Sequence, residues 1–362
     1  MNLSSSLKVL TLLRLSISQI NNKMGQGIST TQFFLYGKSH FTATGYTKHV
    51  KKYTEPVQNA ETIKLNEEGA DGFDMSGKVV AVTGANSGVG KALATYAAAK
   101  SAKVYLLCRS KERAEKARKE IVEATSNDQV EVLLADMAEL SQVRDLTSEL
   151  QKKESKIDVL VCNAGALFND RRESSDGREF TFASHLLGGS YLLSQLLVPQ
   201  LKAADNGRVI FVSSGGMYTT KFPDWDTATN SKLSKDKYDG QFAYAYAKRG
   251  QVLLAEELAK SKPEITWVSA HPGWSNTPAV DNAYGDTKKY LEPMRSTWQG
   301  AEGIAWLMAT DKANIVPGSF YLDRKPQRKH LSGPLFSEGT FTKNTQKEID
   351  EMLMSLKNAA GL

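Results

Sequence analysis

Short apolar runs and segments of helical spacing alternate along most of the chain, from residue 78 to residue 321. The apolar runs are rich in β-branched residues, which is typical of strands buried on both faces of a parallel sheet. A first strand is predicted to begin at Lys78 and to end where the glycine-rich stretch begins at Gly84. The later runs predicted as strands are Lys103–Cys108, Val130–Leu134, Ile157–Cys162, Val209–Ser213, Thr266–His271 and Ser319–Leu322.

Longer segments separate these runs and carry apolar residues at helical spacing. The segments predicted as helices are Lys91–Lys100, Ser110–Ala124, Ser141–Glu154, Gly177–Leu201, Gln241–Ser261 and Gln299–Ala309. Repeated strand–helix alternation requires a parallel sheet joined by right-handed crossovers. We therefore predict an α/β fold: a single-domain, Rossmann-type doubly wound parallel sheet of about seven strands, with helices on both faces. A ligand of such a sheet binds beyond the carboxyl ends of the strands, where the strand order reverses.

The loop after the first predicted strand has the spacing T-G-x-x-x-G-x-G. Its glycines remove side chains where the backbone turns sharply, approaches a ligand and packs a helix on a strand. The following helix offers unpaired N–H groups and a positive dipole end to a pyrophosphate. A plain strand-to-helix turn is the alternative. The loop residues predicted to bind a dinucleotide are Thr83, Gly84, Asn86, Ser87, Gly88, Val89 and Gly90.

The next three strand ends carry further candidate cofactor residues. No acid follows the second strand, and Arg109 stands at its tip. Because an acid there selects the 2′-hydroxyl of NAD whereas an arginine binds a 2′-phosphate, we predict NADP(H); a solvated surface arginine is the alternative. Asp136, after the third strand, is expected to accept a hydrogen bond from the adenine amine or to cap a helix. Asn163, Ala164 and Gly165 end the fourth strand and let the backbone lie against a flat ligand.

Three residues have the pattern of a proton-transfer site. Ser214 follows the fifth strand, and Tyr244 and Lys248, four residues apart, share one helix face. A nearby ammonium lowers the pKa of a phenol from about 10 toward the working range. Tyr244 would then pass a proton to or from a substrate oxygen while a hydride moves at the neighbouring carbon, and Ser214 would hold the same oxygen. We predict these three residues to be catalytic, and we predict no metal site.

Over residues 76–325 the chain resembles the short-chain dehydrogenase/reductase family. The matching motifs, in family order, are Thr83–Gly90, Asp136, Asn163–Gly165, Ser214, Tyr244 with Lys248, and Pro272-Gly273. The resemblance implies an NAD(P)-dependent oxidoreductase in which Tyr244 is the acid or base, Lys248 binds the nicotinamide ribose and Ser214 positions the carbonyl. It also implies that the segment with Pro272, Gly273 and Thr277 receives the nicotinamide amide. One member is more similar still, in Ser213–Met217, His271–Trp274, Asp323–Pro326 and the aromatic segment near residues 33–53.

One departure from the family concerns the helix before the fifth strand. Many members place an asparagine there, which completes a proton relay to the lysine. Counting from Phe182 puts His185 in its place, whereas counting back from Tyr191 puts Leu186 there. An imidazole supports a relay because it both donates and accepts hydrogen bonds, and a leucine does not. A buried structural histidine is the alternative.

A second departure is the span between Ser214 and Tyr244, about twice the usual family length. It contains Tyr218, Phe222 and Trp225. These residues are expected either to line an apolar pocket near the catalytic end, as in the retinol-dehydrogenase-like members, or to belong to a solvated loop unrelated to substrate.

The termini extend beyond the predicted catalytic domain. The predicted division is 1–31 as an N-terminal tail, 32–75 as an arm and linker, 76–325 as the cofactor-binding catalytic domain and 326–362 as a C-terminal extension. The tail is serine-rich and free of acids, which suits a mitochondrial presequence or a disordered tail. A myristoylation pattern follows Met24 and applies if translation begins there. Residues 32–54, the aromatic arm, mix aromatics with lysines, which suits an anionic membrane surface or packing over the core.

Charge and cysteine content narrow the functional classes. The net charge of +6 is not concentrated in a recognition helix, so no nucleic-acid partner is predicted. Two cysteines exclude a disulfide framework and indicate a reducing compartment, so we expect the cytoplasm, with the mitochondrion or a membrane surface as alternatives. The predicted function is an NADP(H)-dependent carbonyl reductase or alcohol dehydrogenase with a small or lipid-like apolar substrate; a weakly catalytic NADPH-binding scaffold or sensor is the alternative. The family resemblance also implies a homodimer formed through helices.

Overall fold

Eight strands form one sheet in the order β3-β2-β1-β4-β5-β6-β7-β8. This computed structural model describes residues 25, 27–54, 72–231, 237–333 and 336–362. The N-terminal tail up to Met24, where a presequence or a myristoylation site was expected, and most of the linker lie outside the described residues. The strands are β1 (Val79–Thr83), β2 (Lys103–Cys108), β3 (Val130–Leu134), β4 (Val159–Cys162), β5 (Arg208–Val212), β6 (Thr266–Ala270), β7 (Phe320–Leu322) and β8 (Lys325–Gln327).

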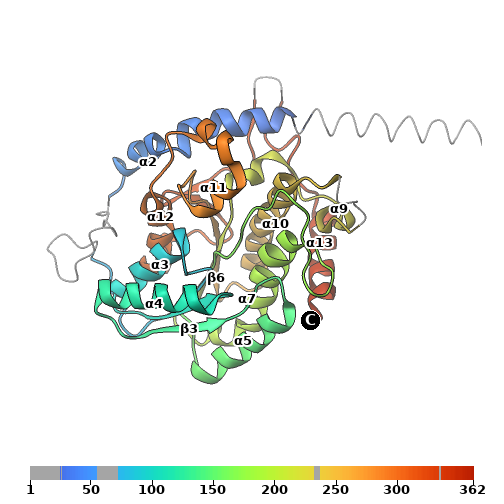
Figure 1. Cartoon of the computed structure of the whole chain (residues 1–362). Coiled ribbons are helices and arrows are strands. Elements are labelled where there is room, and N and C mark those ends of the chain that lie inside the picture. The colour runs from blue at the N-terminus through green and yellow to red at the C-terminus, as the bar shows by residue number, and fades with distance from the viewer. Residues whose placement is uncertain (1–24, 26, 55–71, 232–236, 334–335) are drawn as a thin grey trace, which may run out of the picture.

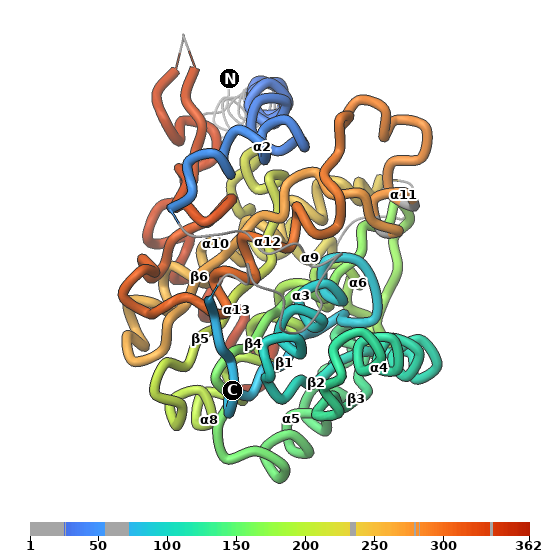
Figure 2. Tube along the Cα trace, turned by 90° about the vertical axis from the view of Figure 1, so that its left-hand side faces the viewer, coloured from blue at the N-terminus to red at the C-terminus, as the bar shows by residue number. Residues whose placement is uncertain are grey.

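The sheet is doubly wound about β1, which confirms the predicted fold class. Strand β1 pairs in parallel with β2 on one side and with β4 on the other. The labels β3, β2, β1, β4 and β5 follow one another across the molecule in Figure 2. The chain therefore reverses its direction of travel between β1 and β4, and the carboxyl ends of these strands frame a ligand crevice.

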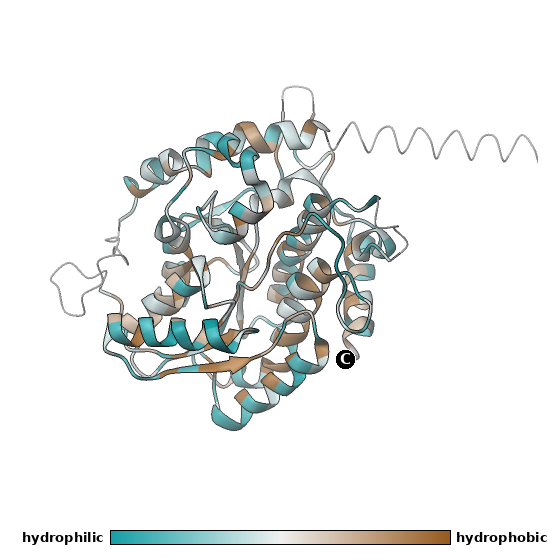
Figure 3. Ribbon diagram, viewed as in Figure 1, coloured by the Kyte–Doolittle hydropathy of each residue, from teal (hydrophilic) through white to brown (hydrophobic). Residues whose placement is uncertain are grey.

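Successive side chains of each central strand pack in two different hydrophobic cores, one on each face of the sheet. Val80 and Val82 pack with α3 (Gly88–Ala99), α4 (Lys111–Thr125) and α12 (Thr297–Ala309). Val79 and Ala81 belong to the opposite core. The helices of that core include α5 (Leu140–Lys153), α10 (Gly240–Ser261) and α13 (Gln346–Ala360). Figure 1 shows these layers, and Figure 3 shows hydrophilic residues on the outer side of α4. Strands buried on both faces explain the continuous apolar runs.

The edge strand β8, which pairs antiparallel with β7, was not predicted from the sequence. The turn between them contains Asp323 and Arg324, both with positive φ angles of 52° and 64°. No glycine marks this turn, so the usual hairpin signal is missing. Ion pairs hold both turn residues instead: Asp323 pairs with Arg295, and Arg324 pairs with Glu302. Ion pairs with distant residues thus stabilise a turn that a local glycine would normally stabilise.

The long helix predicted over about 177–201 is present as a nearly continuous helical segment, but its turns are not all α-helical. It contains α6 (Phe180–Phe182), the π-helix η2 (Ala183–Leu192), α7 (Leu193–Leu196) and α8 (Val198–Lys202). All residues of η2 are buried, and the Ser190 hydroxyl donates to the carbonyl of His185, five residues earlier, at 2.6 Å. A wider helical turn shifts every later residue around the axis, and hydrophobic spacing cannot reveal this shift.

In the long span after Ser214, Tyr218 and Phe222 neither line the pocket nor lie in a solvated loop, the two arrangements expected from the sequence. It forms η3 (Gly215–Thr219) and α9 (Trp225–Thr229). Tyr218 and Phe222 are buried in the cores and are absent from the lining of the ligand cavity. The Tyr218 hydroxyl donates to the carbonyl of Arg328 at 2.6 Å, so Tyr218 packs against the C-terminal part of the chain, whereas Gly216 and Thr219 of the same span line the cavity.

The aromatic arm packs on the molecule near the carboxyl ends of β6 and β7. A helix over residues 27–40 and α2 (Ala43–Val50) lie at the upper edge of Figure 1, above α11 (Pro278–Tyr284) and α12. Phe33 and Phe41 are buried in a third core with Trp274 and Phe320. The remaining short helices are η5 (Gly285–Leu291) and η6 (Lys312–Asn314). Within the described ranges, no helix combines the length and the apolar character needed to cross a membrane.

Candidate active site

One cavity of about 540 Å³ opens at the carboxyl ends of the strands and collects the residues singled out from the sequence. Every predicted site residue except Thr83 lines it. The lining residues among them are Gly84, Asn86, Ser87, Gly88, Val89, Gly90, Arg109, Asp136, Asn163, Ala164, Gly165, Ser214, Tyr244, Lys248, Pro272, Gly273 and Thr277.

Thr83 lies behind the cavity and joins two strands. Its side chain is fully buried, and its hydroxyl oxygen accepts from the backbone N–H groups of Asn163 at 2.8 Å and Ala164 at 2.7 Å. The Asn163 amide in turn donates to the Thr83 carbonyl at 3.0 Å. Thr83 therefore positions the loop after β4 and does not reach the cavity itself.

The glycine loop has the shape that a pyrophosphate requires. Gly84 and Gly88 have φ angles of +66° and +54°, which favour glycine. The side chain of Ser87, the N-cap of α3, makes no capping hydrogen bond, so the first-turn N–H groups of this helix face the cavity without that partner. Such a helix start attracts phosphate through its N–H groups and its dipole. These residues thus fit the diphosphate of a dinucleotide.

Two arginines stand at the end of the cavity beyond β2. Arg109 is half exposed, and its guanidinium lies 3.6 Å from the Asp136 carboxylate. Arg113, from the first turn of α4, lines the same cavity. The Asp136 carboxylate also accepts a hydrogen bond from the N–H of Ala138 at 3.0 Å. It therefore stabilises the turn after β3 and also lines the cavity. This end of the cavity offers guanidinium groups to an anion.

Tyr244 is partly buried, lines the cavity and is hydrogen-bonded to Ser214. Burial raises the pKa of Tyr244 to about 12, and the hydrogen bond with Ser214 lowers this pKa only in part. The prediction that the Lys248 ammonium lowers the pKa of Tyr244 is wrong, because the pKa of Tyr244 is raised. Lys248 lies 5.4 Å from the centroid of the Tyr244 ring, and its own charge is penalised by burial. Tyr244 is therefore a protonated phenol at neutral pH.

Lys248 is held by two acceptors inside the protein. Its ammonium donates to the Val212 carbonyl at 2.7 Å and to the Gln251 side-chain oxygen at 3.1 Å. Burial lowers the pKa of Lys248 to about 7. The other end of the Gln251 amide donates to the His185 carbonyl at 3.1 Å and to the Ser190 hydroxyl at 2.9 Å. Gln251 thus connects the lysine directly to the π-helix.

Of the two residues considered for the asparagine's place, the structure brings His185 next to Tyr244 and places Leu186 in the core. The His185 ring lies edge-on to Tyr244, with ring centroids 5.3 Å apart, whereas Leu186 is buried in the core. A Cβ added at Gly165 would lie 2.0 Å from the His185 ring, so only glycine admits the imidazole at this place. His185 Nε2 lies 3.0 Å from the Ala166 carbonyl, and burial holds the pKa of His185 well below its ordinary value.

Several residues that line the cavity, and one buried behind it, were missed by the sequence reasoning. Gln251 follows Lys248 by three positions on the same helix, a spacing that could have identified it. Arg113 follows Arg109 by four positions but belongs to the first turn of α4, not to the strand end where the motif was expected. Phe33 and Phe34 come from the aromatic arm, and no local pattern relates them to Ser214 and Tyr244, which lie more than a hundred residues later in the sequence.

Comparison with known proteins places this constellation in one family. A model of the short chain dehydrogenase family matches residues 78–222. Dehydrogenase/reductase SDR family member 12 from Homo sapiens, the member to which Ser213–Met217 and the other segments point, is 34% identical over 320 residues, covering 88% of this chain and 94% of that protein. Retinol dehydrogenase 12 from Bos taurus is 31% identical over 255 residues, covering 69% of this chain and 78% of that protein.

Solved structures agree on the fold. A short chain dehydrogenase from Escherichia coli CFT073, complexed with NADPH, has a TM-score of 0.54 at 21% identity and covers 68% of this chain and 96% of its own. A structure from Mycobacterium paratuberculosis has a TM-score of 0.58 at 23% identity and covers 84% of this chain and 97% of its own. With its sheet order, its glycine loop and its Ser–Tyr–Lys constellation, this chain belongs to the short-chain dehydrogenase/reductase family of NAD(P)-dependent oxidoreductases.

Proposed function

We propose that the protein is an NADP(H)-dependent carbonyl reductase that acts on an apolar aldehyde or ketone. The observation that carries this proposal is the position of Tyr244. Its protonated phenol is hydrogen-bonded to Ser214 within the cavity that also receives the glycine loop and the two arginines. A proton donor, an oxygen-binding hydroxyl and a dinucleotide cradle thus open into one space, as carbonyl reduction requires.

The preference for NADP(H) rests on charge. Arg109 and Arg113 line the end of the cavity beyond β2, and both supply guanidinium groups that match a 2′-phosphate. The sequence from Leu106 to Ser110 contains no acid that would repel this phosphate. The similar Escherichia coli structure was solved with NADPH, which supports the same choice.

The chain's own residues perform the proton chemistry. The bound cofactor supplies the hydride when a carbonyl is reduced. Ser214 donates a hydrogen bond to the carbonyl oxygen and holds it next to Tyr244. As the carbonyl carbon accepts the hydride, its oxygen takes the phenolic proton of Tyr244, so that the carbonyl becomes an alcohol. A phenol with a pKa of about 12 is protonated at neutral pH and is therefore ready to act as the acid in this direction. The tyrosinate then recovers a proton from solvent.

The proposed class of substrate follows from the rest of the lining. Apolar and aromatic side chains form much of the remaining lining of the cavity: Phe33, Phe34, Phe242, Trp274, Leu291 and Met294. Such a lining favours an apolar substrate with one polar group at the reacting end. The name of a relative, retinol dehydrogenase, is consistent with an apolar substrate.

The test replaces Tyr244 by Phe in the full chain. NADPH oxidation is measured with aldehydes, ketones, quinones, retinal and steroids, and NADPH binding is titrated in the same preparation. We expect Tyr244→Phe to lose on the order of a hundredfold or more of kcat while it binds NADPH as the wild type does, because only the transferred proton is removed. Tight NADPH binding without turnover of any substrate by the wild type would favour the scaffold or sensor instead.

A further inference from the structure

We infer that the aromatic arm forms a wall of the substrate pocket, where Phe34 and Phe33 select carbonyl compounds with a long apolar chain. This inference rests on the proposed function, since it assigns the part of the substrate remote from the carbonyl. The arm lies before residues 78–222, the part of the chain that the family model matches. Phe33 and Phe34 nevertheless line the same cavity as Ser214 and Tyr244.

The arm reaches the backbone next to the catalytic serine. A Cβ added at Gly215 would lie 2.7 Å from the Phe41 ring and 2.9 Å from the Phe33 ring. Such distances are shorter than packed side chains allow, so the absence of a side chain at Gly215 lets the two rings approach. The rings of the arm therefore pack directly beside the residue that holds the substrate oxygen.

Phe33, Phe34 and Trp274 form one aromatic face at this end of the cavity. The Trp274 ring centroid lies 5.8 Å from that of Phe33 and 6.1 Å from that of Phe34. A Cβ at Gly37 would lie 2.4 Å from the Trp274 ring, which shows how closely the arm helix approaches the tryptophan. Val280, Leu291 and Met294 continue the lining, and none of these six side chains carries a charge. This face suits methylene groups or rings, not a polar chain.

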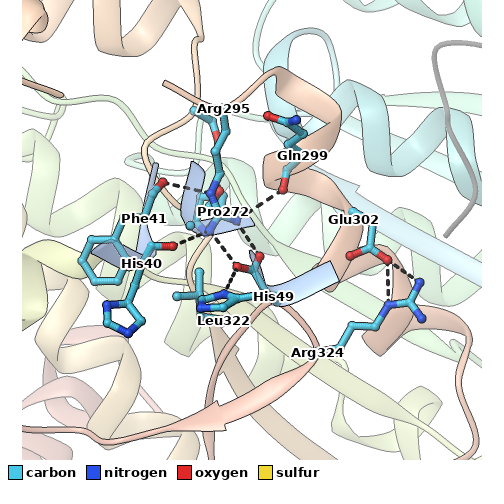
Figure 4. A network of polar contacts seen from close by, with 12 residues as sticks. His40, Phe41, His49, Pro272, Arg295, Gln299, Glu302, Leu322 and Arg324 are labelled. Carbon is cyan, nitrogen blue, oxygen red and sulfur yellow. Dashed lines mark hydrogen bonds and ion pairs between the residues drawn. The ribbon is translucent and has the colours of Figure 1, made fainter. Parts of the chain in front are cut away.

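A buried ion-pair network fixes the arm in this position. Arg295 is fully buried, and its guanidinium donates to the carbonyls of Phe41 at 2.9 Å and His40 at 2.8 Å. It also binds both oxygens of Asp323, at 2.5 and 2.7 Å, and Asp323 pairs with His49 of α2 at 2.7 Å. Figure 4 shows Arg295 between the arm residues His40 and Phe41 on one side and His49 on the other. The arm is therefore anchored at several points, as a rigid wall must be.

The neighbouring residues on the arm provide a matched comparison. Phe34 lines the cavity and is 37% exposed, whereas Leu35 is 69% exposed and does not line the cavity. Both are apolar residues of the same helix. Replacing each by serine removes a similar amount of apolar surface from the arm, but only Phe34→Ser removes it from the pocket.

The experiment measures kcat/KM for decanal and for propanal with the full-length protein and NADPH. We expect Phe34→Ser to lower kcat/KM for decanal at least about tenfold, because only the long chain reaches this wall, and to leave propanal within about twofold of the wild type. Phe33→Leu, which keeps an apolar residue at the buried position, is expected to act in the same direction. Leu35→Ser is expected to leave both substrates unchanged. An equal loss for the two aldehydes, or no loss for decanal, would overturn the inference.

A binding measurement separates this inference from the proposed function. Decan-1-ol is titrated calorimetrically into the protein saturated with NADP⁺, which requires no turnover. The wild type could reduce neither aldehyde yet bind decan-1-ol about tenfold more tightly than Phe34→Ser does. The proposed function would then be wrong, but the assignment of Phe34 to the wall of the pocket would be confirmed. If decan-1-ol binds the wild type and Phe34→Ser equally, or binds neither, the assignment of the wall is wrong.

Discussion

Gln251 is the residue whose replacement tests the local chemistry most directly. Its side-chain oxygen accepts from the Lys248 ammonium at 3.1 Å, and its amide nitrogen donates to the His185 carbonyl and the Ser190 hydroxyl. It is 1% exposed, so no solvent replaces these bonds. We predict that Gln251 is a positioning residue that stabilises the charged form of Lys248. Replacing it by leucine removes the acceptor, and replacing it by glutamate supplies a negatively charged acceptor instead.

The size of the effect follows from the hydrogen bond. Burial lowers the pKa of Lys248 to about 7, and an acceptor opposes this because it stabilises the ammonium. A hydrogen bond to a charged group contributes roughly 1.5–3 kcal/mol, and about 1.4 kcal/mol corresponds to one pH unit. Gln251→Leu should therefore lower the pKa of Lys248 by about one pH unit. Gln251→Glu should raise it by a similar or larger amount.

The assay is the pH dependence of kcat/KM with NADPH and decanal. The family resemblance implies that Lys248 binds the nicotinamide ribose, and a charged ammonium is a stronger hydrogen-bond donor than a neutral amine, so activity should fall as pH rises through the pKa of Lys248. The alkaline limb should move to lower pH in Gln251→Leu and to higher pH in Gln251→Glu. Both variants lose the donor to the π-helix, so a purely structural role would affect them alike. Alkaline limbs that stay in place, or that move in the same direction, would refute the reasoning.

Three other variants test the cofactor end, the arm anchor and a buried histidine. Arg109→Asp should shift the ratio of NADPH to NADH activity toward NADH, and an unchanged ratio of the two kcat/KM values would exclude Arg109 from binding the 2′-phosphate. Arg295→Met leaves Asp323 buried without its guanidinium partner, so urea unfolding should show a loss of about 3–5 kcal/mol, and Arg295→Met with Asp323→Asn, which removes the unpaired charge at a positive φ angle that asparagine tolerates, should lose less. Burial lowers the pKa of His271 to about 3, so the unfolded chain binds a proton that the folded chain does not, and stability should fall as pH drops below about 6.5. At pH 5 this costs about 2 kcal/mol, and His271→Phe should reduce the slope of thermal stability against pH; an unchanged slope would contradict it.

The strands show how far local pattern extends. The bounds predicted for Lys103–Cys108 and Val130–Leu134 are those of β2 and β3. Strand β2 is buried on both faces and carries a continuous apolar run, whereas the edge strand β3 is half-buried and was located by its β-branched residues. Strand β8 was missed because its turn depends on ion pairs from Arg295 and Glu302, residues that lie at least twenty positions earlier in the chain. Sequence pattern therefore located β2 and β3 but not β8, whose turn depends on distant ion pairs.

Tyr218 and Phe222 show a second limit of prediction from the sequence. Their aromatic character indicated an apolar environment, and they are indeed buried. Yet an aromatic residue has the same sequence signal in a pocket wall and in a core. The aromatics that line the cavity, Phe33 and Phe34, come instead from the aromatic arm. Only the tertiary contacts decide which aromatic side chains meet a ligand.

The sequence by itself determined the doubly wound sheet and the strand ends that carry the glycine loop, Ser214, Tyr244 and Lys248, because hydrophobic period and motif spacing are local properties of the chain. Tertiary structure decided the environment of these groups. His185 rather than Leu186 lies next to Tyr244, and burial raises the pKa of Tyr244 above its ordinary value. Both effects depend on where the rest of the chain packs, and no local pattern contains that information.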